Sequence, residues 1–183
     1  MKTSLLFLLL LLSAKIHATE IDGFYVGIRG DTVQCKFDIH TNADGVVNYS
    51  LLTEAVKIIT ENGKKRTLKA GGIRHFYVRG DLNEKFVSLK LHDKYVFLME
   101  LDNRKLKLYE HHFRAEDGTH TEMHYVIQSP FKRPSELTPI RFKKQLLRYT
   151  NDDPFFAGKF LDKSWKYNKI DQLVASYNDQ AAK

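Results

Sequence analysis

Cysteine is almost absent from this chain of 183 residues, in which Cys35 stands alone. A single thiol excludes an intrachain disulfide, so the stability of the fold must come from its core and from backbone pairing. Cys35 lies in a row of alternating apolar residues rather than in the polar, electropositive surroundings that activate a nucleophile. We therefore expect a buried structural thiol.

Long apolar runs are scarce as well. The most pronounced one, Leu5 to Leu12, follows Lys2 and is cut off by Lys15, which makes it shorter than the roughly 20 apolar residues of a transmembrane helix. A short run of this kind ending in a small residue is typical of a secretory signal peptide. We predict cleavage after Ala18, export to the periplasm or the extracellular space, and no membrane span in the mature chain. No cysteine follows the run, as a bacterial lipoprotein would require.

Established catalytic signatures are also missing. The sequence contains no Gly-x-Ser-x-Gly elbow, no His-Glu-x-x-His helix, and no glycine-rich loop followed by the lysine that binds phosphate. These absences favour a protein that is not an enzyme. One alternative stays open, a glycan or cell-wall hydrolase that uses two carboxylates. Its candidate pairs are Asp81 with Glu84, Glu100 with Asp102, and Asp152 with Asp153.

The charge is only mildly basic once the leader is removed. The chain has 29 basic and 22 acidic residues, and two of the lysines lie in the leader. Most of the basic excess falls in two clusters, which we interpret as solvated faces, with an anionic lipid, lipopolysaccharide or polysaccharide as the alternative contact. Nucleic acid is not expected, because no binding motif accompanies the charge. The clusters are Lys64, Lys65, Arg66 and Lys69 on a loop tip, and Arg141, Lys143, Lys144 and Arg148 on a helix.

Residues 24–37 alternate apolar and polar side chains as β-strands do. A two-residue turn at Gly30-Asp31 would form a hairpin. It would place Val26 opposite Cys35 and Phe24 opposite Phe37, with both apolar sets on one face.

Further short β-like runs follow, separated by turn residues. The segment Tyr95 to Leu101 is apolar on both faces apart from Glu100, which predicts a central strand covered on both sides. An antiparallel meander is the expected arrangement. The runs cover residues 46–52, 56–60, 73–79, 86–91, 95–101, 105–113 and 122–128.

The periodicity becomes helical near the end of the chain. Thr138 with Pro139, and Asp153 with Pro154, are start signals for two helices. A third helix is expected from about Asn168, because apolar residues follow at i, i+3, i+4 and i+7. These residues are Ile170, Leu173, Val174 and Tyr177.

We therefore predict an α+β fold with residues 1–18 as signal peptide and 19–183 as one domain. Its body, residues 19–130, would be a barrel-like or sandwich meander of about nine antiparallel strands. A helical tail of three short helices, residues 131–183, would pack on that body.

Histidines gather around the last predicted hairpin. A two-residue loop at Asp117-Gly118 would set His111 opposite His124 and Phe113 opposite Glu122. Two imidazoles and the Glu122 carboxylate would then share one face, where they are a candidate Zn²⁺ or Cu²⁺ site. Exposed polar residues on a strand ribbon and a pH-sensitive surface are the alternatives. In either case His112 would point to the opposite face.

Aromatic residues are plentiful on the predicted strands, among them Phe24, Tyr77 and Tyr109. Core packing explains most of them, and an exposed platform that stacks on sugar is the alternative. The partner of such a protein would be an envelope component, either protein or glycan.

Several short motifs lie along the chain from the first predicted strand to the last predicted helix: Gly23-Phe24-Tyr25-Val26, Gly30-Asp31-Thr32, Phe97-Leu98, Leu106-Lys107-Leu108-Tyr109, Tyr125-Val126-Ile127, Asp152-Asp153-Pro154 and Tyr177-Asn178. In these motifs the chain resembles a family of uncharacterised exported proteins from Bacteroidota-type bacteria. The resemblance implies export by a Gram-negative cell and a β-rich body with a helical tail, and it carries no activity or site residue with it. The function we expect is non-enzymatic binding or scaffolding in the cell envelope. A periplasmic metal-binding protein and a glycan hydrolase are the alternatives.

Overall fold

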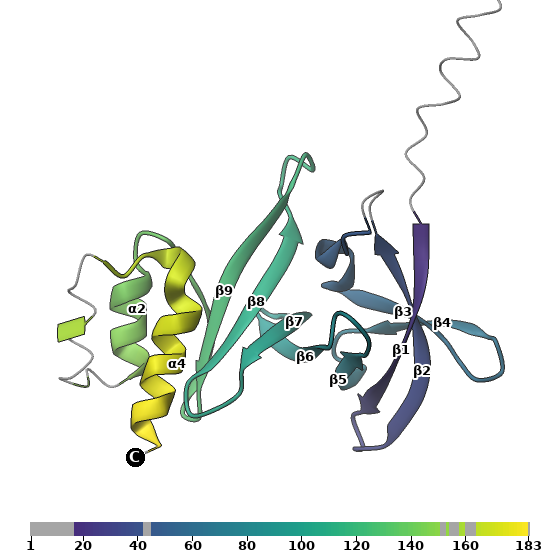
Figure 1. Ribbon diagram of the computed structural model, residues 1–183, viewed down its shortest axis with the longest axis horizontal. Helices are drawn as coiled ribbons and strands as arrows, with labels where there is room; N and C mark the ends of the chain where they lie inside the picture. The colour runs from purple at the N-terminus through teal and green to yellow at the C-terminus, as the bar shows by residue number, and fades with distance from the viewer. Residues whose placement is uncertain (1–16, 42–44, 151–152, 154–157, 160–163, 183) are drawn as a thin grey trace, which may run out of the picture.

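The computed structural model describes residues 17–41, 45–150, 153, 158–159 and 164–182. They form an open sheet in the order β10-β9-β8-β7-β6-β5-β1-β2-β3-β4, with antiparallel neighbours throughout (Figure 1). The strands are β1 (His17–Gly27), β2 (Thr32–Thr41), β3 (Ala55–Ile59), β4 (Lys65–Lys69), β5 (Ile73–Val78), β6 (Glu84–Leu91), β7 (Lys94–Asp102), β8 (Lys107–Arg114), β9 (Thr121–Ser129) and β10 (Lys132–Leu137).

The helical elements lie mostly at the C-terminal end. They are the 3-10 turns η2 (Tyr49–Leu52) and η3 (Tyr167–Lys169) and the α-helices α2 (Phe142–Tyr149) and α4 (Ile170–Ala181). None of the helices within the described ranges combines the length and apolar character needed to cross a bilayer. The predicted α+β, β-rich class is confirmed, but the sheet is neither a closed barrel nor a sandwich.

In the middle of strand β7, at Val96 to Leu98, both faces are buried, as the sequence predicted, whereas Tyr95 and Leu101 at the ends of the predicted segment are exposed. Phe97 and Leu98 are 2% and 0% exposed, and they belong to different apolar clusters. Neighbouring residues of a strand point to opposite faces. The sheet therefore buries one face in its N-terminal half, β1 to β5, and the opposite face around β7 to β9.

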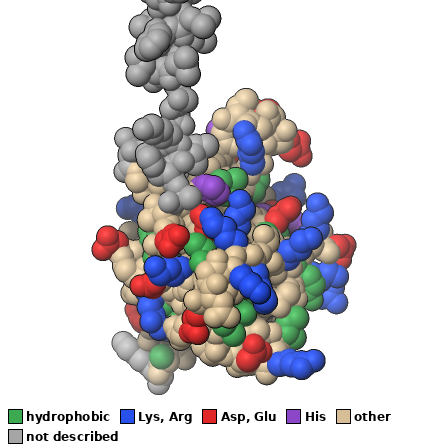
Figure 2. Space-filling model, turned by 90° about the vertical axis from the view of Figure 1, so that its right-hand side faces the viewer, with side chains coloured by type: hydrophobic (Ala, Val, Ile, Leu, Met, Phe, Trp, Pro, Cys, Tyr) green, Lys and Arg blue, Asp and Glu red, His purple; other side chains and the backbone are tan. Residues whose placement is uncertain are grey.

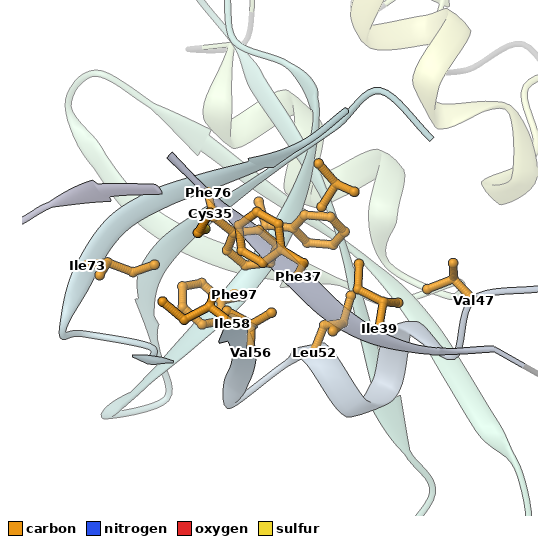
Figure 3. Close-up of a cluster of buried hydrophobic side chains, with 12 residues drawn as sticks. Cys35, Phe37, Ile39, Val47, Leu52, Val56, Ile58, Ile73, Phe76 and Phe97 are labelled. Atoms are coloured by element: carbon orange, nitrogen blue, oxygen red, sulfur yellow. The ribbon is translucent and has the colours of Figure 1, made fainter. Parts of the chain in front are cut away.

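The core of the N-terminal half combines aliphatic side chains with a group of packed phenylalanine rings (Figure 3). The Phe76 ring lies 5.1 Å from Phe37, 4.6 Å from Phe86 and 5.0 Å from Phe97, measured between centroids. Cys35 is buried in this cluster, which confirms the structural thiol. Because Phe86 and Phe97 lie on β6 and β7, these two strands tie this core to the rest of the sheet.

The C-terminal half, β8 to β10 with α2 and α4, is covered on both faces. On one face, Leu108 and Ile127 pack against Leu146 and Leu173 of the helices. The other face holds an aliphatic cluster that includes Leu98 and Val126. The sheet curves far enough for β10 to contact β6.

The predicted first hairpin has the wrong register. Gly23, not Val26, is opposite Cys35, and Ile21, not Phe24, is opposite Phe37. The cause is a longer turn, in which the Gly27 amide donates to the Asp31 carbonyl at 2.8 Å. This odd shift turns Phe24 to the other face of the sheet.

Three other segments differ from prediction. Strand β10 lies within residues 131–183, which were predicted to form a helical tail. Residues 49–52 form η2 rather than a strand, because Tyr49 and Leu52, three residues apart, both pack on the N-terminal core as one helical turn allows. The basic loop tip is the edge strand β4, whose mostly exposed side chains show no apolar alternation. Charged side chains are common on edge strands because they discourage pairing with another sheet.

The helical tail matches the prediction in part. In α4, Ile170, Leu173, Val174 and Tyr177 are all buried, as their spacing predicted. Helix α2 begins at Phe142, three residues after Pro139, because the Thr138 carbonyl accepts from the Arg141 and Phe142 amides in a turn. The helix predicted from Asp153 falls mostly outside the described residues, as does the predicted leader up to residue 16.

Candidate functional site

The β8–β9 hairpin has the predicted register. His111 is paired with His124 and Phe113 with Glu122. The Phe113 ring lies 5.0 Å from His111 and 4.9 Å from His124, between ring centroids. His112 points to the opposite face, as expected from the alternation of a strand.

A carboxylate that the hairpin pattern does not include is the closest partner of His111. Glu136 of β10 lies opposite Val126, which places it on the same face as His111 and His124. Its Oε1 is 2.7 Å from His111 Nδ1. This hydrogen bond holds the pKa of Glu136 below its usual value, although partial burial opposes the shift. The nearby imidazoles of His124 and His92 act in the same direction as His111.

His124 lies between two carboxylates. Its Nδ1 is 3.9 Å from Glu136 Oε2, and its Nε2 is 3.7 Å from Glu122 Oε2. Glu122 Oε1 is in turn 3.5 Å from His120 Nε2. His92, on the turn between β6 and β7, has its Nδ1 4.0 Å from Glu136 Oε2.

Together these groups form one network, which we call the histidine–carboxylate site. It consists of His92, His111, His120, His124, Glu122 and Glu136. The site grades from buried to exposed: the side chain of His111 is 13% exposed, that of His124 30% and that of His92 74%. Its inner end is therefore held by the sheet, while its outer end faces solvent.

The structure changes the predicted set of partners within this site. His111 and His124 share a face as predicted, but Glu136 rather than Glu122 is the partner of His111. Within the described ranges, no three His, Cys, Asp or Glu side chains already stand as a formed metal site. The hairpin pattern gave no sign of His92 or Glu136, because only the curvature of the sheet brings β10 and the β6–β7 turn to this place. Strand β10 contains Pro134, which an edge strand accommodates.

A second titratable cluster lies on the opposite face of the sheet. His112 Nε2 is 2.8 Å from Glu110 Oε2, and the His112 ring stacks 4.9 Å from Tyr49. The Tyr49 hydroxyl donates to Glu84 Oε1 at 2.7 Å. Burial raises the pKa of Glu84, and the Glu110 carboxylate raises it further, although the Tyr49 hydrogen bond lowers it. Among the described residues, nothing hydrogen-bonds the buried Glu84 Oε2.

This cluster joins the two halves of the sheet. The adjacent cavity of about 210 Å³ is lined by Tyr49 and His112 but by neither carboxylate. The Thr53 hydroxyl, next to η2, donates to the His112 carbonyl. The cluster therefore links η2 to β6 and β8.

Basic side chains pair with both members of the predicted pair Glu100 and Asp102, and the Tyr49 hydroxyl donates to Glu84 of the pair Asp81 and Glu84. Glu100 pairs with Lys85 at 2.9 Å, and Asp102 with Arg104 at 2.6 Å. Asp152 lies outside the described residues.

A cleft of about 720 Å³ in the N-terminal half is lined in part by Cys35. Burial raises the pKa of this thiol to about 11. The thiol therefore stays protonated at neutral pH, which makes it a poor nucleophile.

The predicted aromatic platform is limited in the structure. Tyr109 is 1% exposed and belongs to the core. Phe24 and Tyr77 are half-buried and stack on each other at 5.5 Å, with the Arg79 guanidinium 5.7 Å from the Phe24 ring.

Compared with known protein families, curated proteins and solved structures, the chain matches none of them.

Proposed function

We propose that the protein is an exported, non-enzymatic binding module of the cell envelope that takes its ligand at the histidine–carboxylate site. One observation carries the proposal: the Glu136 carboxylate faces His111, His124 and His92, which come from two strands and a turn far apart in the sequence. Export is inferred from the leader pattern of residues 1–18.

The ligand chemistry that suits these side chains is a divalent transition metal, Zn²⁺ or Cu²⁺. Imidazole nitrogen and carboxylate oxygen are preferred donors for both ions. Glu136 Oε2 has two imidazole nitrogens within 4.0 Å, one from His92 and one from His124. Ligand atoms about 2.0–2.1 Å from a tetrahedral zinc ion stand roughly 3.4 Å apart, so binding requires these rings to move inward by about half an ångström.

The burial gradient favours this movement. His92 lies on an exposed turn and can change rotamer, whereas His111 is largely buried and holds the other Glu136 oxygen. A histidine that hydrogen-bonds a ligating carboxylate orients it for the metal. The proposed ligands are therefore His92, His124 and Glu136, with His111 as the positioning residue.

Isothermal titration of the protein, purified without a histidine tag, with Zn²⁺ and Cu²⁺ tests this proposal. We expect the double variant His111→Ala, His124→Ala to lose at least tenfold in affinity. Glu136→Gln should weaken binding more than Glu122→Gln, which separates the set seen in the structure from the set predicted by the hairpin pattern. His112→Ala is the matched control, because it removes a neighbouring histidine from the opposite face.

Unchanged affinity in the double variant would contradict the metal assignment. The non-enzymatic part has its own test. The purified protein is incubated with peptidoglycan, and the release of soluble fragments is measured. Release by the wild type that is lost in the Glu84→Gln variant would contradict a non-enzymatic function and favour the hydrolase alternative.

A further inference from the structure

Two large apolar side chains are almost fully exposed, and both lie next to α2. Phe131, at the β9–β10 turn, is 93% exposed, and Ile140, just before α2, is 95% exposed. The other exposed large apolar residues range from Leu101 at 40% to Val46 at 58%. Burial of these two side chains on a partner would recover the free energy that their exposure to water costs.

Helix α2 runs back along β10 between these two residues. The Gln145 side-chain amide donates to the Glu136 carbonyl at 2.8 Å, and the Tyr149 hydroxyl donates to the Arg133 carbonyl at 2.6 Å. Ile140 thus precedes one end of the helix, and Phe131 lies beyond the other end. The eight residues of α2 span about 12 Å.

The outward side of α2 is basic. Phe142 and Leu146 face the core, while Arg141, Lys144 and Arg148 are exposed at i, i+3 and i+7. These positions lie on the side of the helix opposite the two buried residues. Along the axis of α2, the three basic residues therefore lie between Ile140 at one end and Phe131 at the other.

The whole segment has a one-sided charge. Residues 130–150 contain six basic residues and one acidic residue, Glu136. The Glu136 carboxylate is directed to the histidine–carboxylate site on the sheet. No acidic side chain follows it as far as Thr150, so α2 itself carries positive charge only.

On the face shown in Figure 2, blue and red side chains are interspersed. The second basic cluster, on β4, includes Lys65, which pairs with Asp38 at 3.2 Å. Its apolar residue Leu68 is partly buried against the N-terminal core. Of the two basic clusters, only the one on α2 therefore lies next to apolar side chains that are almost fully exposed.

We propose that α2 and the β9–β10 turn dock on the surface of an anionic phospholipid bilayer. In this arrangement Phe131 and Ile140 enter the boundary between headgroups and acyl chains, and Arg141, Lys144 and Arg148 contact lipid phosphates. Apolar side chains buried at the interface and basic residues attracted to anionic lipid are the two contributions that hold peripheral proteins on membranes. This docking is independent of metal binding, because none of these residues belongs to the histidine–carboxylate site.

Co-sedimentation of the protein with vesicles tests the docking. The vesicles are 70% phosphatidylcholine and 30% phosphatidylglycerol, and pure phosphatidylcholine is the reference. We expect binding to the anionic vesicles only, reduced as salt is raised. Each Lys or Arg at an anionic surface is worth about fivefold in partition. The double variant Lys144→Glu, Arg148→Glu should therefore lose at least tenfold.

Two further variants make the result specific. Phe131→Ser, Ile140→Ser should lose at least tenfold without any change of charge. Arg66→Glu, Lys69→Glu makes the same change of charge on β4 and should bind as the wild type does. Far-UV circular dichroism checks that each variant is folded.

Three results would overturn the proposal. The first is the absence of binding to anionic vesicles. The second is that the β4 variant loses binding as strongly as the α2 variant, and the third is that Phe131→Ser, Ile140→Ser binds as the wild type does. The second and the third would each indicate non-specific attraction of a basic protein to a polyanion.

Discussion

The two halves of the sheet close their cores in different ways. In the N-terminal half, strands and η2 surround a cluster that combines aliphatic side chains with packed phenylalanine rings. In the C-terminal half, helices cover one face, and the aliphatic cluster on the other face gives way to histidines and carboxylates along β8 and β9. The candidate site therefore lies where the apolar packing along β8 and β9 ends. Strands β6 and β7 connect this region to the phenylalanine rings of the N-terminal core.

The largest expected effect tests whether the halves are one cooperative unit. Phe76→Ala should destabilise the protein by about 3–5 kcal/mol, because it leaves a cavity among three other phenylalanine rings. Since β6 and β7 carry two of those rings, urea unfolding followed by Trp165 fluorescence, a probe of the C-terminal half, should coincide with circular dichroism. Ile28→Ala, at a residue 57% exposed, is the control. Two separate transitions would show that the halves unfold independently.

The second prediction concerns how α4 is held in the C-terminal half. Asn178 is 2% exposed, donates to the Leu106 carbonyl at 2.8 Å and accepts from the Leu106 amide at 2.9 Å. Asn178→Ala leaves both backbone groups buried without these partners and should cost about 2–3 kcal/mol in urea unfolding. The neighbouring Asp179→Ala removes only an exposed pairing with Arg104 and should cost below about 1 kcal/mol. Equal losses in the two variants would contradict this role of Asn178.

The third prediction uses the lowered pKa of Glu136. A carboxyl whose pKa is lowered by folding stabilises the protein above its unfolded pKa, and this contribution is lost as the pH falls through the folded value. Glu136→Gln should therefore cost about 1 kcal/mol at pH 7, with the difference shrinking in acid. Thermal unfolding of both proteins from pH 7 to pH 3 measures it. A difference that grows as the pH falls would contradict the assigned sign.

The smallest effect has the opposite sign and comes from Glu84, where the two halves meet. Its pKa is raised in the fold, so its contribution is complete below the unfolded pKa and is lost as the pH rises through the folded value. Glu84→Gln keeps an acceptor for Tyr49 and should stabilise the protein at pH 7 by up to about 1 kcal/mol. The gain should disappear in acid. The exposed Glu116→Gln should leave the same thermal unfolding curves unchanged, and a loss of stability at Glu84 would contradict the assignment.

The pattern of neighbouring residues was sufficient to predict those elements whose contacts lie close together in the sequence. The β8–β9 register followed from the Asp117-Gly118 turn, and the buried face of α4 followed from helical spacing. The register of the first hairpin was predicted wrongly although it is equally local. A turn that is longer by an odd number of residues moves the side chains of one strand to the other face of the sheet, and Gly30-Asp31 does not specify the length of the turn. The β4 edge strand was missed because an exposed strand carries no apolar alternation.

The sequence by itself determined a β-rich chain with a helical end, a buried Cys35, the burial of both faces in the middle of β7, and the pairing of His111 with His124. Only the tertiary structure decided that Glu136 and His92 join those histidines, and that Glu84, Tyr49 and His112 connect the two halves. The physical reason is separation along the chain. Period and turn chemistry act over a few residues, whereas the curvature that brings β10 to β6 arises from the packing of the whole sheet.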